Sequence, residues 1–222
     1  MSEGFKKFRH VHLVGSGGVG MFAIGGILLE QGICVSGSDL EKNSKSEFLR
    51  SKGAEIFYGH AAGNLPSDAD ALIYTSAASA DNPEMLAAEK RGIPCFRRGQ
   101  FLAEQILPCY ERSAAVAGSH GKSTVSAMIT HVLRKQNINT GCLIGGTLQD
   151  GSLPYSAGDG SIFVTDVMRV TTVILCCTRQ WQLLPIMMRI MRGAKSRKKN
   201  SLKNFSFFAE MHGLLYIMIF QY

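Results

Sequence analysis

The chain has 222 residues, of which 45% are hydrophobic and 18% charged, a composition that supports one or two globular domains and excludes a disordered protein. Its apolar stretches are interrupted by Gly or charge well before the roughly 20 residues that a membrane-spanning helix needs, and its start lacks the pattern of a signal peptide. The six Cys residues lack metal-ligand spacing. We therefore expect a soluble, cytoplasmic protein without membrane insertion.

The net charge of +7 is distributed unevenly. Nine of the 24 Lys and Arg residues, but only one of the 17 acidic residues, lie in residues 167–222, which leaves 15 basic and 16 acidic side chains in residues 1–166. The body of the chain is therefore nearly neutral, and we expect no nucleic-acid partner. The tail also contains six of the ten Met residues and the only Trp, so the chain changes character near residue 166.

Strands and helices are predicted to alternate through the first hundred residues. Strands are expected at 11–14, 34–39, 54–58, 71–75 and 93–96, and helices from a glycine-rich turn to about residue 30, at 44–52 and at 83–91. Such alternation indicates a parallel α/β sheet wrapped by helices.

A second unit begins after Arg98. Its predicted elements are a helix at 100–107, a buried strand at 113–117, a helix at 125–136, a sharp turn at 141–146 and a strand at 161–166 that ends at an acid. We predict an α/β protein with a Rossmann-like parallel-sheet domain (1–99), the start of a P-loop-type α/β ATPase domain (100–166) and a distinct tail (167–222).

The first glycine-rich turn fits the pattern G-x-G-x-x-G and carries an acid, Asp39, 19 residues beyond its last Gly. Glycines let backbone N–H groups approach a diphosphate, and the following helix N-terminus adds a favourable partial charge. The predicted binding residues are Gly15, Ser16, Gly17, Gly18, Val19, Gly20 and Asp39. The alternatives are a merely tight strand–helix turn and a solvated loop acid.

The second turn ends in the Gly-Lys-Ser core of a P-loop, although Val116 stands where the standard pattern has its first Gly. Lys122 is placed to reach the β and γ phosphates of ATP, and the Ser123 hydroxyl to meet Mg²⁺. The predicted ATP-binding residues are Gly118, Ser119, His120, Gly121, Lys122, Ser123 and Thr124. The alternative is an ordinary helix start with an exposed Lys.

Several short motifs stand out along the chain: H-x-x-G-x-G-G-x-G-M at 12–21, S-G-S-D at 36–39, A-G-S-H-G-K-S-T at 117–124, Asn82-Pro83-Glu84 and Ile144-Gly145-Gly146. Together they resemble the motifs of the Mur ligases. The Gly-Gly-x-Gly-Met form is most similar to the alanine-adding branch. The resemblance covers about residues 1–166.

This resemblance implies a first domain that binds a UDP-sugar and a central domain that binds Mg-ATP. The implied substrates are UDP-N-acetylmuramate and L-alanine, joined through an acyl phosphate in peptidoglycan synthesis. It further implies that Gly15 to Gly20 hold the UDP diphosphate, that Lys122 contacts the γ-phosphate and that Ser123 binds Mg²⁺. His120 matches a family position, and its implied catalytic role competes with a simple role in capping the loop.

The resemblance stops at Asp166. The family pattern at this point is E-A-D-E-x-D, whose first Glu serves Mg²⁺, and we expect Asp166 to replace that Glu with a side chain one methylene shorter. Beyond it, a reading-frame slip explains the foreign composition. The shifted frame is one in which each codon consists of the last base of one residue's codon and the first two bases of the next residue's codon. In that frame, with permitted third bases, residues 167–191 can be reread as DEGDDGHSLLHPPMAIATNYDADH. That string resembles the family's continuation, in which D-E-x-D precedes L-H-x-P, A-I-x-T-N and D-H.

We therefore interpret residues 167–222 as an out-of-frame tail, and we expect little or no ligase activity from the printed chain. The alternative for the tail is a genuine basic, amphipathic segment that contacts membranes or RNA. The alternative functions for the body are a non-catalytic UDP-sugar or nucleotide-binding module and an NAD-dependent oxidoreductase.

Overall fold

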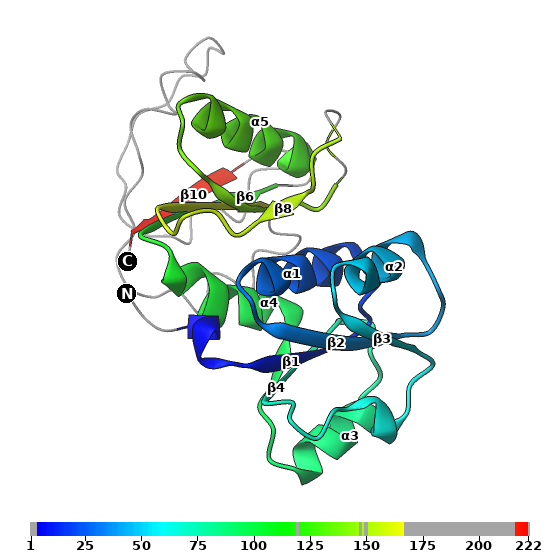
Figure 1. Cartoon of the computed structure of the whole chain (residues 1–222). Coiled ribbons are helices and arrows are strands. Elements are labelled where there is room, and N and C mark those ends of the chain that lie inside the picture. The colour runs from blue at the N-terminus through cyan, green and yellow to red at the C-terminus, as the bar shows by residue number, and fades with distance from the viewer. Residues whose placement is uncertain (1–3, 119, 147, 149–150, 167–215, 222) are drawn as a thin grey trace.

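The computed structural model describes residues 4–118, 120–146, 148, 151–166 and 216–221. They form two sheets with helix α1 (Val19–Glu30) between them (Figure 1). The rereading proposed for 167–191 lies outside the described residues.

The first sheet has five parallel strands in the order β3-β2-β1-β4-β5. Helices α1 and α2 cover one face and α3 the other (Figure 1). In such sheets, ligands bind beyond the carboxyl ends of the strands where the strand order reverses, which here is between β1 and β4. The strands are β1 (His10–Val14), β2 (Cys34–Asp39), β3 (Glu55–Tyr58), β4 (Ala71–Tyr74) and β5 (Cys95–Arg97), and the other helices are α2 (Ser44–Ser51), α3 (Pro83–Lys90) and the 3₁₀ turns η1 (Gly4–Lys7) and η2 (Ala62–Asn64).

Local signals set the starts of the surface helices. Asn43 and Ser46 form a capping box on α2, in which the Asn43 side chain accepts from the Ser46 N–H at 3.0 Å and the Ser46 hydroxyl accepts from the Asn43 N–H at 3.1 Å. Asn82 caps α3 in a similar way, and Pro83 occupies the first turn, where its missing N–H has no intrahelical partner to lose.

The second sheet has the order β10-β6-β9-β7-β8. Strands β6, β9 and β7 are parallel, whereas β8 and β10 lie antiparallel at the two edges. Helix α5 (Lys122–Lys135) covers the face that points away from α1 (Figure 1). The strands are β6 (Arg112–Ala117), β7 (Gly141–Leu143), β8 (Tyr155–Ser156), β9 (Ile162–Asp166) and β10 (Tyr216–Gln221).

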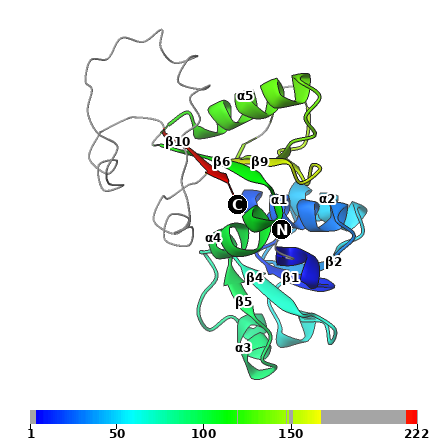
Figure 2. The same ribbon diagram turned by 90° about the vertical axis from the view of Figure 1, so that its left-hand side faces the viewer.

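Strand β10 is the described part of the tail. It runs antiparallel to β6, with Tyr216 opposite Ala117 and Gln221 opposite Arg112 (Figure 2). The N–H and C=O groups of an edge strand pair with any extended segment that reaches them. The position of β10 therefore requires an extended backbone rather than a particular sequence.

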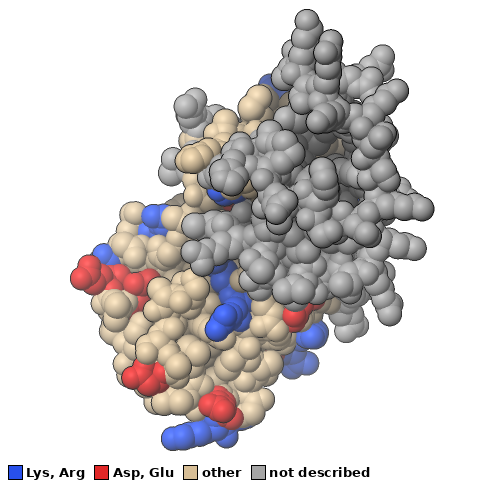
Figure 3. Space-filling view, turned by 180° about the vertical axis from the view of Figure 1, so that it is seen from behind, with Lys and Arg blue, Asp and Glu red and all other residues tan. Residues whose placement is uncertain are grey.

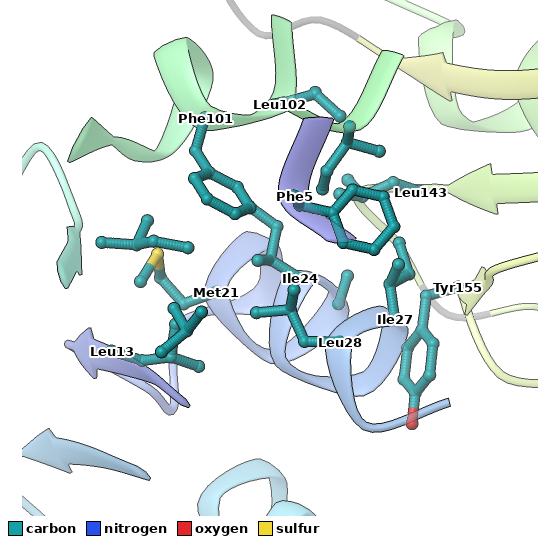
Figure 4. Close-up of a cluster of buried hydrophobic side chains, with 14 of the residues drawn as sticks. Phe5, Leu13, Met21, Ile24, Ile27, Leu28, Phe101, Leu102, Leu143 and Tyr155 are labelled. Atoms are coloured by element: carbon teal, nitrogen blue, oxygen red, sulfur yellow. The ribbon is translucent and has the colours of Figure 1, made fainter. Parts of the chain in front are cut away.

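Helix α1 is buried on all sides. Its residues 21–28 are all buried, as expected for a helix that is apolar around its whole circumference. On one side it packs toward Leu13 of the first sheet, and on the other toward Leu143 and Tyr155 of the second (Figure 4). One continuous apolar cluster therefore joins the two sheets.

A close contact fixes the second sheet against α1. The Tyr155 ring lies so near Gly26 that a Cβ there would be 2.0 Å from the Tyr155 Cζ. The same ring meets Phe22 edge-on with a centroid separation of 5.3 Å, and Glu30 Oε2 accepts a hydrogen bond from the Ala157 N–H at 2.7 Å. Glycine at position 26 is what permits this approach.

The predicted α/β class is confirmed, as are the five strands of the first sheet and strands β6 and β9 of the second. Strands β8 and β10 were not predicted, and three further segments differ from the prediction. The turn predicted at 141–146 is wrong for residues 141–143, which form strand β7. Gly141 serves strand packing here, because a Cβ at this position would lie only 2.7 Å from Phe163 Cδ2. Helix α5 begins at Lys122, three residues before the predicted start. The helix predicted at 100–107 is split into α4 (Arg98–Phe101), the π-helix η3 (Leu102–Ile106) and the 3₁₀ turn η4 (Leu107–Cys109), and Pro108 has no N–H with which to continue an α-helix.

The described surface mixes charges of both signs. On the face shown in Figure 3, acidic and basic side chains are interspersed over the part of the surface that is not grey. Among the described residues, no helix combines the length and apolar character that crossing a bilayer requires.

Candidate nucleotide-binding sites

The first glycine-rich turn connects β1 to α1 at the carboxyl end of the first sheet. Gly15 has a φ of 83°, a left-handed conformation that favours glycine. The N–H groups of Gly15 and Ser16 donate to the Ser38 carbonyl at 2.8 and 2.9 Å, which ties the turn to the end of β2. Among the described residues, no side chain caps the N-terminus of α1. The geometry matches that of an anion-binding helix start.

Asp39 lies against the same turn. Its Oδ2 accepts a hydrogen bond from the Gly17 N–H at 2.6 Å, and its Oδ1 accepts from the Leu40 N–H at 2.8 Å. The carboxylate therefore shapes the turn. Its predicted direct role in binding a ligand stays a prediction.

Arg98 reaches this site although the sequence pattern did not single it out. A Cβ on Gly20 would lie 2.3 Å from Arg98 Nη1 and 2.9 Å from its Cδ, so the guanidinium rests on the first turn of α1. A cation at this position complements a diphosphate held by the helix N-terminus. In the sequence, Arg98 could have been identified only by its position directly after β5, the last strand of the first sheet.

The Ser16 hydroxyl of this turn has no hydrogen-bond partner among the described residues. The side chain is fully buried. The remaining residues of the predicted turn, Gly18 and Val19, are exposed at the start of α1. The structure thus brings all the predicted turn residues and Asp39 together at one edge of the sheet.

The second turn connects β6 to α5. Gly118 and Gly121 have φ values of 153° and 75°, and Gly121 is the residue that precedes the first turn of α5. Lys122 and Ser123 are consequently the first two residues of the helix. Ser119 lies outside the described residues, so its predicted role remains untested.

Lys122 bends back over this turn. Its Nζ donates a hydrogen bond to the Gly118 carbonyl at 2.8 Å. His120 and Thr124 are exposed, and His120 forms no hydrogen bond to another described residue, which leaves its capping role without support.

Ser123 and Asp166 meet at the carboxyl end of the second sheet. The Ser123 hydroxyl donates to Asp166 Oδ2, and both Asp166 oxygens accept from the Gly145 N–H at 2.9 Å. Asp166 is 7% exposed, and a Cβ on Gly145 would lie 3.0 Å from Asp166 Oδ2. Hydroxyl and carboxylate oxygens are ligands that Mg²⁺ prefers. The predicted metal-binding pair is therefore adjacent in space.

These two oxygen ligands fit a magnesium ion that is shared with a nucleotide. No group of three or more His, Cys, Asp or Glu side chains suitable for a metal occurs in the described residues. Magnesium is commonly held by one or two carboxylates, water and substrate phosphates rather than by a complete protein cage. A phosphate at the Lys122 turn would supply the missing ligands.

A buried polar network lies below the first turn. Ser38 and Glu84 belong to two of the motifs given above, but the sequence did not predict that they contact each other. Glu84 in the first turn of α3 is fully buried, and its carboxylate accepts from the Ser38 hydroxyl at 2.5 Å and from Asn64 Nδ2 at 2.8 Å. Burial by itself raises the pKa of Glu84, but hydrogen bonds from His12, Ser38 and Asn64 outweigh it and lower the pKa to about 2. Glu84 is thus a buried anion at the end of β2.

Comparison with known proteins places these turns in a family context. Residues 10–109 match the Mur ligase family, catalytic domain. A UDP-N-acetylmuramate--L-alanine ligase of Alkaliphilus metalliredigens is 42% identical over 160 residues, which are 72% of this chain and 34% of that protein. One of Aquifex aeolicus is 41% identical over 166 residues, 75% of this chain and 35% of that protein. The chain therefore spans about a third of the length of the curated relatives that it matches.

Solved structures give the same picture. The UDP-N-acetylmuramate-alanine ligase of Thermotoga maritima superposes with a TM-score of 0.64 at 31% identity, covering 71% of this chain and 37% of that one. A UDP-N-acetylmuramate:L-alanyl-gamma-D-glutamyl-meso-diaminopimelate ligase from Neisseria meningitides has a TM-score of 0.66 at 27% identity, covering 74% of this chain and 54% of that one. The N-terminal similarity thus extends from sequence to three-dimensional structure.

Proposed function

Because the N-terminal part of this chain belongs to the Mur ligase family, we propose that it carries the sugar-nucleotide site and part of the ATP site of an ATP-dependent ligase. The substrates of that ligase are UDP-N-acetylmuramate, L-alanine and ATP, and its product enters peptidoglycan synthesis in the cytoplasm. The observation that carries the proposal is the pair of glycine-rich turns, each at the carboxyl end of its own sheet. The two sheets are held together by the buried helix α1, which packs between them.

In the proposed reaction, a carboxylate oxygen of the muramate attacks the γ-phosphorus of ATP and ADP leaves. The amine of L-alanine then attacks the carbonyl carbon of the acyl phosphate, phosphate leaves, and the nitrogen loses a proton. The first step builds negative charge on the phosphoryl oxygens, and the second builds it on the carbonyl oxygen and on the departing phosphate. Positioning and charge neutralisation therefore account for most of the catalysis.

Residues of the second turn suit this task. The Lys122 ammonium exchanges its bond to the Gly118 carbonyl for the γ-phosphate, and Gly121 presents backbone without a side chain. When bound, Mg²⁺ supplies charge neutralisation between the phosphates, and Ser123 and Asp166 are the residues that would hold it. His120 stays a candidate for direct contact with the reacting groups, since its side chain is exposed beside the turn.

The first turn suits the diphosphate of the sugar nucleotide. The N–H groups of Gly15 to Gly18 donate within the protein and hold the turn in shape. The turn thereby leads to the uncapped start of α1, where Val19 and Gly20 present the first helical N–H groups and the Arg98 guanidinium lies beside them. A neutral ligand would not need a cation at this helix start, whereas a diphosphate is stabilised by both groups.

The 222-residue chain matches about a third of the relatives' length. We propose that groups supplied by the remaining two thirds of those relatives are needed for turnover. The chain by itself then binds nucleotides but shows little or no ligase activity. Turnover of labelled alanine by the purified chain would contradict this part of the proposal.

A thermal-shift titration tests the binding function against the alternatives. UDP-N-acetylmuramate and Mg-ATP should each raise the melting temperature, and NAD should not, because ligand binding to the folded state stabilises it. Stabilisation by NAD alone would favour an oxidoreductase. Stabilisation by UDP-N-acetylmuramate without any effect of Mg-ATP would favour a non-catalytic sugar-nucleotide module.

The domain boundaries at 99 and 166 and the out-of-frame interpretation of the tail are part of the same proposal. Sequencing the DNA across the codons of residues 160–191 tests the interpretation directly. A missing or additional base would place a ligase continuation in the frame of the first 166 residues. A confirmed printed frame would contradict the interpretation.

A further inference from the structure

The buried carboxylate of Glu84 gathers hydrogen-bond donors from three segments. Its Oε2 accepts from Ser38 Oγ and lies 3.5 Å from both His12 Nε2 and His60 Nδ1. Its Oε1 accepts from the Ala61 N–H at 3.2 Å and from Asn64 Nδ2 at 2.8 Å. The catalytic steps proposed above make no use of this group.

The hydrogen-bond partners fix where each proton resides. An ionised carboxylate only accepts, so the single Ser38 hydroxyl proton must point at Glu84. Ser38 Oγ lies 2.9 Å from His60 Nδ1 and has only an acceptor lone pair left for it. In the neutral imidazole of His60 the proton is therefore on Nδ1, and Nε2 is an acceptor.

The same reasoning orders the next histidine. His12 Nε2 faces the Glu84 carboxylate and carries a proton, so in the neutral ring Nδ1 accepts from the Ser36 hydroxyl at 2.8 Å. His12 is fully buried, whereas the His60 side chain is 20% exposed. Of the two rings, only that of His60 is accessible to a ligand.

The position of His60 relates this network to the sugar nucleotide. His60 follows β3 directly, and Ser38 precedes Asp39, whose carboxylate holds the Gly17 N–H. In a fold of this kind, the diphosphate sits at the β1 turn and the nucleoside extends along the ends of the neighbouring strands. The Nε2 atom of His60 has no hydrogen-bond partner among the described residues.

We propose that Glu84 is a positioning residue: through Ser38 it sets the tautomer of His60, so that His60 Nε2 accepts a hydrogen bond from a hydroxyl or N–H group at the nucleoside end of the bound UDP-sugar. This inference rests on the proposed function for the identity of the ligand. The proton order in the unliganded protein does not depend on it.

The first test is the tautomer of His60, measured from ¹⁵N chemical shifts of the ring nitrogens in the unliganded full chain at mildly alkaline pH, with His60→Asn for assignment. The proposal predicts the Nδ1–H form in the unaltered chain and a mixture of forms in Glu84→Gln. A purely structural role of Glu84 would not change the tautomer. An Nε2–H ring in the unaltered chain would overturn the proposal.

The second test is a double-mutant cycle on the dissociation constant for UDP-N-acetylmuramate, measured by calorimetry. Glu84→Gln and His60→Ala should each weaken binding about tenfold, because each removes one hydrogen bond to a ligand or its support. In the His60→Ala background, Glu84→Gln should have less than about a twofold further effect. Independent, additive losses would contradict the proposal.

Matched variants separate positioning from folding. Asp70→Asn neutralises a carboxylate that accepts from the Arg9 N–H at 2.8 Å at the opposite end of the strands, and it should leave affinity unchanged. If Glu84→Gln does not fold, Ser38→Ala replaces it in the cycle, since it removes the connecting hydroxyl but keeps the carbonyl that holds the turn. Failure of the unaltered chain to bind UDP-N-acetylmuramate would contradict the proposed function, whereas the tautomer result would still decide the proton order.

Discussion

Ser123 and Asp166 lie 43 residues apart in the sequence, and the Ser123 hydroxyl donates a hydrogen bond to Oδ2 of Asp166. The contact arises because β6 and β9 are parallel neighbours, with Val116 opposite Asp166, so their carboxyl ends meet. The first turn of α5 then places Ser123 above the end of β9.

Ser123→Ala and Asp166→Asn should each weaken Mg-ATP binding about tenfold or more, since each removes an oxygen from the predicted metal site. Affinity for ATP in the presence of EDTA should change much less. Calorimetric titration with and without Mg²⁺ measures both. Ser126→Ala is the matched control, because Ser126 is a buried serine of the same helix whose Oγ has no partner among the described residues. Equal losses with and without Mg²⁺ would argue against a metal role.

Arg98→Ala should weaken binding of UDP-N-acetylmuramate by about ten- to a hundredfold, the range expected for losing a hydrogen bond from a charged donor. Binding of uridine, which has no phosphate, should be unaffected. The control is Arg97→Ala, which removes an exposed neighbour of the same charge. An equal effect on uridine and on the UDP-sugar would show that Arg98 does not act on the diphosphate.

Gly26→Ala should destabilise the chain by about 1–3 kcal/mol, because the added methyl group overlaps the Tyr155 ring in a packed interface. Urea unfolding measures the loss. Gly63→Ala is the control, since a Cβ at that position meets no atom within 4 Å. Adding Tyr155→Ala to Gly26→Ala removes the overlap, so the two losses should be less than additive. Full additivity would contradict the contact.

The stabilising contribution of Glu84 should depend on pH in a defined window. Its pKa is lowered from 4.5 to about 2 in the folded chain, so the carboxylate stabilises the fold above pH 4.5 and loses this contribution as the pH falls toward 2. The contribution is of the order of 3 kcal/mol. Urea unfolding of the unaltered chain and Glu84→Gln over this range should give the steeper pH dependence for the unaltered chain. Parallel curves would contradict the lowered pKa.

The sequence predicted the first sheet well because its strands and helices carry strong local signals. Asp39 ends its strand, Asn43 and Asn82 cap their helices, and the glycine-rich turn separates β1 from α1. The run from Met21 to Leu28 also indicates that its helix is buried between two layers, because the run is apolar on every side of the helix.

The second sheet was harder to predict. β7 and β8 have three and two residues, and Gly141 resembles a turn residue although it serves strand packing. The role of Glu84 depends on Ser38, which is 46 residues away, and that of His60 depends on the same Ser38, 22 residues away. The role of Arg98 depends on its position beside Gly20 of helix α1. Pairings of this kind follow from strand order and not from local pattern.

The central claim is that one chain holds two separate nucleotide sites, one at each glycine-rich turn. Calorimetric titration of Mg-ATP into the chain saturated with UDP-N-acetylmuramate tests it most directly. The account predicts that Mg-ATP still binds with a stoichiometry of about one, with Lys122→Ala abolishing only this second binding event. Competition between the two nucleotides for a single site would contradict the account.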